Sequence, residues 1–164
     1  MKRTKIKLMC ASGVFTALIF ICTAYIHIPV HTGYAHIGDG IIYLAASVLP
    51  LPYAVFASAG GAALSDFFSG YALWAPASLI IKAITVLFFS QKNNKIICTR
   101  NLIALIPSLI ICTGGYYIYE ALLTQNFLSP LAGIIGNIIQ SFLSCVLFIV
   151  LGLYLDKFKV KEQL

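Results

Sequence analysis

Residues 131–155 read LAGIIGNIIQSFLSCVLFIVLGLYL and contain no Asp, Glu, Lys or Arg. A helix needs about 20 mostly apolar residues to cross a bilayer, and this stretch is long enough to do so. Pro130 stands immediately before it, at a position where proline favours the start of a helix. We therefore predict a membrane-spanning helix near the C-terminal end of the chain.

Five more apolar stretches precede this one, and charged or turn-forming residues separate them. They are residues 8–26, 37–49, 53–68, 73–89 and 102–123. The first follows a basic cluster, as in a secretory signal, but it exceeds the usual apolar core of about 7–15 residues, so we expect an uncleaved helix. The second and third are short and rich in Gly and Ala, which leaves open that they are re-entrant or strongly tilted. The sequence predicts an all-α membrane protein with six spans, folded as a single membrane domain over residues 1–164.

The composition excludes a soluble enzyme. Of the 164 residues, 60% are apolar and 10% are charged, whereas soluble domains average about 45–50% apolar and about 25% charged residues. A chain this small could not cover so much apolar surface in water. The sequence also lacks the GxxxxGKS/T, HExxH and GxSxG motifs that serve nucleotide, zinc and serine chemistry. We therefore predict no catalytic residue, no cofactor and no metal site.

The net charge of +6 reflects membrane topology and gives no reason to expect a nucleic-acid partner. Ten of the eleven Lys and Arg residues fall in three short patches between or beside the apolar stretches. These patches are Lys2, Arg3, Lys5 and Lys7; Lys92, Lys95 and Arg100; and Lys157, Lys159 and Lys161. Six spans place all three patches on one side, which the positive-inside rule identifies as the cytoplasm. Both termini are then predicted to be cytoplasmic.

A few polar side chains fall inside the predicted spans, where they are costly and usually face a cavity or another helix. They are Asp66, Lys82, Glu120, Asn137 and Gln140. All five fall in the outer half of the predicted bundle. Trp74 shares a helical stripe with Lys82, and either Tyr116 or Tyr117 shares one with Glu120. Stripes on three consecutive helices predict a water-accessible cavity between the fourth, fifth and sixth spans, with rings and hydrogen-bonding groups suited to a small molecule.

Two interpretations of these polar groups stay open. Asp66 and Lys82 could form a structural ion pair between the third and fourth spans, or Lys82 could contact a ligand. The first outer connector carries His27, His31 and His36 with Asp39 close by, which raises the question of a metal site. Because their spacing matches no helical pair of ligands, we expect this connector, with Asp39 included, to act as a lid over the cavity.

Three stretches resemble the substrate-binding S components of energy-coupling factor (ECF) vitamin transporters, in the branch with riboflavin- and hydroxymethylpyrimidine-type members. The first is Gly38-Asp39-Gly40 with the apolar run that follows it to Pro50. The second includes Gly60-Gly61, Leu64-Ser65-Asp66, Gly70-Tyr71 and PASLIIK at residues 76–82. The third is YYIYEA at residues 116–121 together with NIIQ at residues 137–140.

The resemblance implies a subunit of the bacterial cytoplasmic membrane that captures a small water-soluble vitamin or precursor with high affinity for an ECF-type ABC importer. It implies three partners in trans, a membrane coupling subunit and two ATPase subunits. Family members often present an AxxxA pattern of the first span to the coupling subunit. The nearest match here is Gly13 and Ala17, whose small-xxx-small spacing permits close helix approach.

The resemblance also implies a ligand site under the first outer connector. It points to Trp74, Tyr117, Glu120, Asn137 and Gln140 as ligand contacts, with Tyr34 and His36 in the lid. Lys2 stands where members that bind nickel or cobalt have a histidine, which argues against a metal substrate. Glu, Asn and Gln beside aromatic rings suit a neutral or cationic nitrogen heterocycle. Hydroxymethylpyrimidine or a thiamine-type ligand fits best, and riboflavin or a pyridoxine-type ligand comes next. The alternative is a non-transporting assembly factor or small oligomeric channel.

Overall fold

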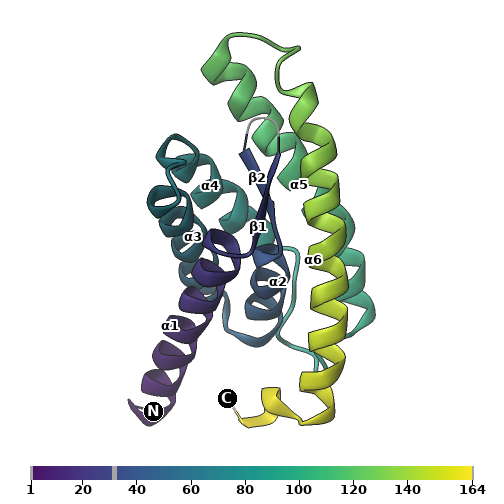
Figure 1. The fold of residues 1–164 in the computed structure, drawn as a ribbon. Helices are drawn as coiled ribbons and strands as arrows, with labels where there is room; N and C mark the ends of the chain where they lie inside the picture. Colours follow the sequence, from purple (N-terminus) through teal and green to yellow (C-terminus); the bar gives the residue numbers. More distant parts are fainter. Residues whose placement is uncertain (1, 31–32, 164) are drawn as a thin grey trace.

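The computed structural model describes residues 2–30 and 33–163. Six α-helices and one β-hairpin make up almost all of it (Figure 1). The elements in chain order are α1 (Lys2–Ala24), β1 (His27–Val30), β2 (Gly33–His36), α2 (Gly38–Val48), α3 (Leu51–Phe68), the 3-10 turn η1 (Ala72–Trp74), α4 (Ala75–Val86), α5 (Thr99–Thr124), α6 (Leu131–Lys157) and the 3-10 turn η2 (Val160–Gln163). The prediction of an all-α protein with six helices is confirmed.

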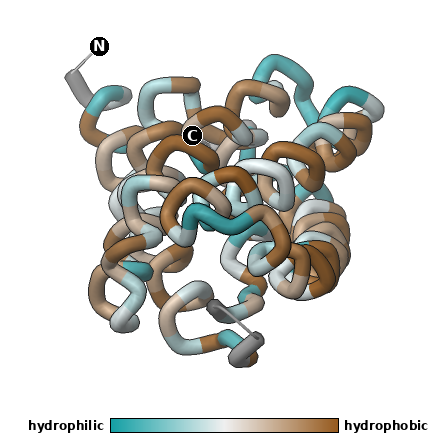
Figure 2. The backbone as a smooth tube through the Cα atoms, turned by 90° about the horizontal axis from the view of Figure 1, so that it is seen from above, coloured by the Kyte–Doolittle hydropathy of each residue, from teal (hydrophilic) through white to brown (hydrophobic). Residues whose placement is uncertain are grey.

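Among the described residues, three helices are long and apolar enough to cross a membrane by themselves. They lie at residues 4–24, 99–124 and 131–157. Helix α2 and the η1–α4 segment are apolar but shorter, and α3 has 18 residues. Hydrophobic residues make up much of the backbone when the bundle is seen from above (Figure 2). The chain is therefore a multi-pass membrane protein in which long and short helices are combined.

Helix α2 lies at the centre of the bundle, and every residue from Gly38 to Val48 is buried. It packs against α1, α3, α4 and α6, which explains why its sequence is apolar on all sides. The Tyr43 ring stacks on Phe89 at a centroid distance of 5.1 Å and meets Phe148 edge-on at 6.0 Å. The hairpin leads directly into the N-terminal end of this central helix.

The limits of the helices follow local sequence signals. Pro52 and Pro76 stand in the first turns of α3 and α4, where the missing N–H of proline costs nothing. Helix α1 begins at Lys2, ahead of the apolar stretch that starts at residue 8, because lysine and arginine are themselves good helix formers.

Both termini lie at the same end of the bundle, and the α5–α6 connection lies at the opposite end (Figure 1). The connector between α4 and α5 is tied to the C-terminal part of α6. Both carboxylate oxygens of Asp156 accept backbone hydrogen bonds, from Ile96 N–H at 2.7 Å and from Ile97 N–H at 2.9 Å. The basic connector and the basic tail therefore meet at one end, as a six-span topology requires.

Candidate functional site

The hairpin is antiparallel, with His27 opposite His36 and Ile28 opposite Ala35. Only one residue separates β2 from the buried helix α2. The imidazole of His36 fixes this junction, because its Nδ1 accepts a hydrogen bond from the Gly38 N–H at 3.1 Å. The second strand is thus anchored on the helix that forms the centre of the bundle.

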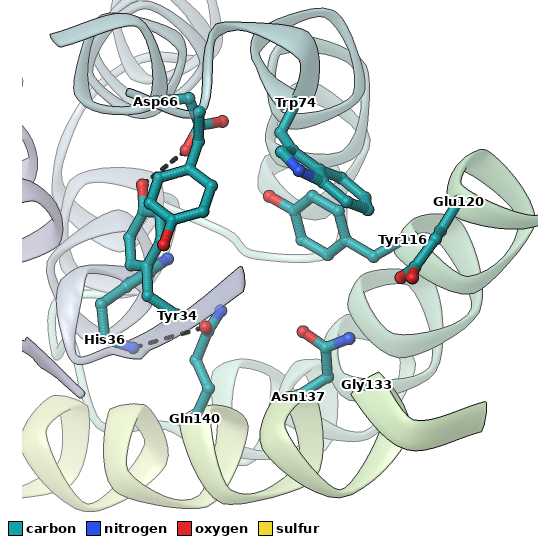
Figure 3. Close-up of a pocket in the computed structure, with 10 residues that line it drawn as sticks. Tyr34, His36, Asp66, Trp74, Tyr116, Glu120, Gly133, Asn137 and Gln140 are labelled. Atoms are coloured by element: carbon teal, nitrogen blue, oxygen red, sulfur yellow. Dashed lines mark hydrogen bonds between the residues drawn. The ribbon is translucent and has the colours of Figure 1, made fainter. Parts of the chain in front are cut away.

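A pocket lies between the hairpin and helices α3, α5 and α6 (Figure 3). Its lining residues are Tyr34, His36, Asp66, Tyr71, Trp74, Tyr116, Glu120, Gly133, Asn137 and Gln140. The space open to the centre of a water molecule is about 70 Å³. The pocket therefore has the size of a small ring compound.

Tyr34 of β2 lies along one side of the pocket and connects the hairpin to α3. Its hydroxyl donates a 2.6 Å hydrogen bond to Oδ1 of Asp66, and its ring lies 4.7 Å from that of Tyr71 and 5.5 Å from that of His36. A short bond to a carboxylate is about twice as strong as a neutral one. The hairpin is thus attached to α3 at the rim of the pocket.

The pKa values of two hairpin groups reflect this enclosed setting. Burial, reinforced by the nearby Asp66 carboxylate, raises the pKa of Tyr34 well above its usual value. Burial lowers the pKa of His36 to about 4. At neutral pH the phenol is therefore protonated and the imidazole is neutral. With His36 Nδ1 accepting from Gly38, its remaining nitrogen carries the proton.

Aromatic rings of η1 and α5 form the opposite wall. The Trp74 ring meets Tyr116 edge-on at a centroid distance of 6.2 Å. The Tyr116 hydroxyl shares a 2.6 Å hydrogen bond with Ser78, which fixes the ring against α4. Glu120 follows Tyr116 by one helical turn, and its side chain points into the pocket beside Asn137 (Figure 3). Asp66 and Glu120 thus place carboxylates on opposite sides of the pocket.

The floor of the pocket rests on a buried ion pair. Lys82 Nζ lies 2.8 Å from Oδ1 of Asp39 and donates a hydrogen bond to Oδ2 at 3.0 Å. Gln140 Nε2 donates to the same Oδ2 at 2.9 Å. The Oε1 of Gln140 accepts from the His36 N–H at 3.4 Å. Gln140 therefore links the hairpin, the pocket and the buried charges.

This arrangement corrects two of the sequence predictions. The predicted ion pair between Asp66 and Lys82 is wrong, since Lys82 pairs with Asp39 instead. Asp39 also lies in the floor, where it is 1% exposed, so it does not belong to the lid. Both errors have one cause: Asp39 lies in the first turn of α2, and burial of that helix brings its carboxylate under the pocket beside α4.

Lys82 and Tyr117 lie outside the pocket lining. Lys82 is 1% exposed and its Nζ lies 5.1 Å from the centre of the Tyr116 ring, so it supports the wall from behind. The Tyr117 hydroxyl donates to the backbone carbonyl of Phe127 at 2.9 Å. Tyr116 lines the pocket and Tyr117 does not, which decides between the two tyrosines in favour of Tyr116.

The remaining predicted positions are spread over the molecule. His27 contacts the Tyr34 ring at 4.7 Å, and His31 lies outside the described residues. No group of three or more His, Cys, Asp or Glu residues among those described could hold a metal ion. Gly13 and Ala17 both lie exposed on α1.

Three members of the lining were not predicted as ligand contacts. Asp66 was assigned first to an ion pair, and Tyr71 stands in the Gly70-Tyr71 turn that was quoted only for its family resemblance. The position of Tyr71 next to a turn glycine was therefore the sequence signal that could have placed it in the pocket. Gly133 has no side chain, and its sequence position gives no such signal.

The chain matches a family model described as ECF-type riboflavin transporter, S component, over residues 3–157. No curated protein matches the chain. The family match covers the hairpin and all six helices, and thus every residue that lines the pocket.

Proposed function

The chain belongs to the S component family of ECF-type riboflavin transporters, and on that premise we propose that the pocket captures a small nitrogen heterocycle for import. The family makes it a substrate-binding subunit of a vitamin transporter and not an enzyme. It works with a membrane coupling (T) component and ATPases, as the family implies. We place the pocket on the outer side of a bacterial cytoplasmic membrane, because the basic patches gather at the opposite end.

The observation that carries the substrate proposal is the charge of the pocket. Two carboxylates, Asp66 and Glu120, line it, and its described lining contains no lysine or arginine. Lys82, the nearest cation beneath it, is already neutralised by Asp39. Carboxylates accept hydrogen bonds from N–H groups and attract positive charge. A phosphorylated or otherwise anionic vitamin would meet repulsion in this pocket.

The size and the aromatic walls of the pocket narrow the range of candidate substrates further. A space of about 70 Å³ open to the centre of a water molecule suits one or two small rings better than the three fused rings of a flavin. Trp74 and Tyr116 offer faces on which a planar heterocycle stacks. Hydroxymethylpyrimidine or a thiamine-type ligand is therefore our first choice, followed by riboflavin or a pyridoxine-type ligand. A flavin would require the hairpin to move outward.

Trp74 provides a direct test, because it is the only tryptophan of the chain and it lines the pocket. Purified protein would be titrated with hydroxymethylpyrimidine, thiamine, pyridoxine, riboflavin and the phosphate esters of the last three, with Trp74 fluorescence as the signal. We expect the pyrimidine compounds to bind most tightly and the phosphate esters most weakly. Tightest binding of a phosphate ester would contradict the charge argument, and tightest binding of riboflavin would contradict the size argument.

The Glu120→Gln variant tests whether Glu120 contacts the ligand or only supports the structure. The variant keeps the size of the side chain but removes its charge, so we expect weaker binding of a cationic ligand with little change in thermal stability. If Glu120→Gln changed stability alone, and no vitamin bound the wild-type protein, a non-transporting role would regain support. Copurification with an ATPase pair provides an independent check on the transport assignment.

A further inference from the structure

The amide of Gln140 is held in one orientation by the charges beneath it. Its Nε2 has two protons, and one is donated to Asp39 Oδ2 at 2.9 Å. The other side of Nε2 faces the Cys112 sulfur at 3.9 Å. A flipped amide would turn Oε1 toward the Asp39 carboxylate, so that one hydrogen bond would be lost and two acceptors would face each other. The carbonyl of Gln140 is thereby directed away from the floor.

Lys82 makes this orientation obligatory. Its Nζ contacts both carboxylate oxygens of Asp39, at 2.8 and 3.0 Å, and the side chains are 1% and 2% exposed. A buried carboxylate that is paired in this way stays ionised, and an ionised carboxylate only accepts hydrogen bonds. Asp39 therefore accepts a hydrogen bond from Gln140 and has no proton to donate.

A ligand in the pocket would therefore find Gln140 as a hydrogen-bond acceptor. Oε1 accepts one hydrogen bond from the His36 N–H at 3.4 Å, and a carbonyl oxygen has a second lone pair. Gln140 lines the pocket with its amide at the pocket edge (Figure 3), where a ligand would meet this second lone pair. Although an amide can donate as well as accept, the donor half of Gln140 is committed to the floor.

We propose that Asp39 and Lys82 are positioning residues that determine specificity, because they fix Gln140 as an acceptor and so select a ligand with an N–H donor at that edge. An aminopyrimidine edge satisfies this requirement, whereas a ring carbonyl at the same place would face the oxygen of Gln140. This inference rests on the proposed function, since it assumes that the pocket binds a nitrogen heterocycle. Neither Asp39 nor Lys82 needs to touch the ligand.

The test compares two ligands whose hydrogen-bonding atoms are exchanged at this edge, because deamination turns the amino donor into a carbonyl acceptor and the adjacent ring nitrogen into an N–H donor. Hydroxymethylpyrimidine carries an amino group, and its deaminated analogue carries a ring carbonyl instead. In the double variant Asp39→Asn/Lys82→Met both charges are gone, and the asparagine can pair with either orientation of the Gln140 amide. A hydrogen bond to a mismatched group changes affinity on the order of tenfold to a hundredfold. We expect the wild-type preference for the amino compound to fall by at least about tenfold in the double variant.

Lys82→Arg is the matched control, because arginine keeps the positive charge and so keeps Asp39 ionised. We expect this variant to retain the wild-type ratio of the two affinities even if both affinities weaken. A structural role alone would change both affinities together and leave their ratio unchanged. If the double variant kept the full preference for the amino compound, the inference would be overturned while the proposed function stood.

If neither pyrimidine bound the wild-type protein, only our choice of substrate would be contradicted. A second measurement then tests the orientation of Gln140 without a ligand. Gln140 is one of four glutamines in the chain, so isotope labelling of glutamine side chains gives a simple NMR spectrum. We expect the Gln140 amide protons to exchange with water more slowly than those of exposed Gln125, and this protection to decrease in Asp39→Asn/Lys82→Met, where the asparagine pairs with either orientation of the amide. Equally fast exchange of Gln140 and Gln125 in the wild-type protein would overturn the inference.

Discussion

Lys82 Nζ on α4 lies 2.8 Å from Oδ1 of Asp39 on α2, and water reaches almost none of either side chain. The pair joins the central helix of the bundle to the wall behind the pocket. Gln140 of α6 bonds to the same carboxylate, so three helices meet at this point. Burial of an ion pair brings little net stability, but loss of one partner leaves an uncompensated charge.

Removal of one charge should therefore harm the protein more than removal of both. We expect Lys82→Met to lower the free energy of unfolding by about 3–5 kcal/mol, because Asp39 is left buried without its partner. Asp39→Asn/Lys82→Met should cost clearly less. Unfolding in detergent micelles, followed by Trp74 fluorescence, measures both, and Lys95→Met in the exposed connector is the control. Equal losses in the single and double variants would contradict this reasoning.

Tyr34→Phe should loosen the hairpin while preserving its ring contacts. The substitution removes the 2.6 Å hydrogen bond to Asp66, and a hydrogen bond to a charged group contributes about 1.5–3 kcal/mol. We expect bound ligand to dissociate roughly tenfold faster or more. Stopped-flow measurement of Trp74 fluorescence gives this rate. Exposed Tyr25, changed to phenylalanine, serves as the control, and an unchanged rate in Tyr34→Phe would show that the hydrogen bond does not restrain the hairpin.

The lowered pKa of His36 should make the stability of the protein depend on pH. Burial lowers its pKa to about 4, whereas an unfolded histidine titrates at about 6.5. Between these values the unfolded chain binds the proton and the folded one does not, so stability falls as the pH drops from about 6.5 to about 4. Above this window the contribution is complete. The loss should be on the order of 2–3 kcal/mol at the acid end.

His36→Gln isolates this contribution from the other acidic groups. The variant should show a flatter stability profile between about pH 6.5 and about pH 4, measured by denaturant unfolding at a series of pH values. The difference between the two profiles is the quantity of interest, because carboxylates titrate in both proteins. Parallel profiles would mean that His36 is not the group responsible.

Two glycines in neighbouring helices should respond oppositely to alanine. A methyl group at Gly40 would meet the Ser144 carbonyl oxygen at 2.8 Å, whereas one at Gly60 meets nothing within 4 Å. We expect Gly40→Ala to destabilise the protein by about 1–3 kcal/mol, since α2 and α6 must separate. Gly60→Ala should be neutral or stabilising by up to about 1 kcal/mol. Thermal unfolding of the two variants compares them, and similar melting temperatures would refute the close approach of α2 and α6.

The sequence identified the helices and much of the pocket because both depend on local periodicity. Apolar stretches of sufficient length predicted all six helices, and helical stripes predicted Trp74, Glu120, Asn137 and Gln140 as neighbours. The hairpin was expected only as an outer connector. Its strands are four residues each, too short for alternation to distinguish them from a loop.

The pairing of charges could not be read from the sequence. Asp39 and Asp66 are both acidic residues near the outer ends of predicted spans, and either could have faced Lys82. The choice depends on how deeply α2 is buried, which is set by packing against four other helices. Tertiary packing of this kind has no local sequence signal, so the ion pair was assigned to the wrong carboxylate.

The exposed small residues of α1 lead to a prediction about assembly. Gly13 and Ala17 are four residues apart and both exposed, so they lie on one helix face, and a methyl group at Gly13 would meet nothing within 4 Å. Gly13→Leu should therefore fold and bind ligand normally, yet block close approach of the coupling component. We expect it to lose copurification with that component and to reduce vitamin uptake to background, while Val14→Leu on the adjacent exposed face does neither. Normal assembly of Gly13→Leu would assign the docking surface to another helix, because a leucine side chain at the contact cannot be accommodated between two closely packed backbones.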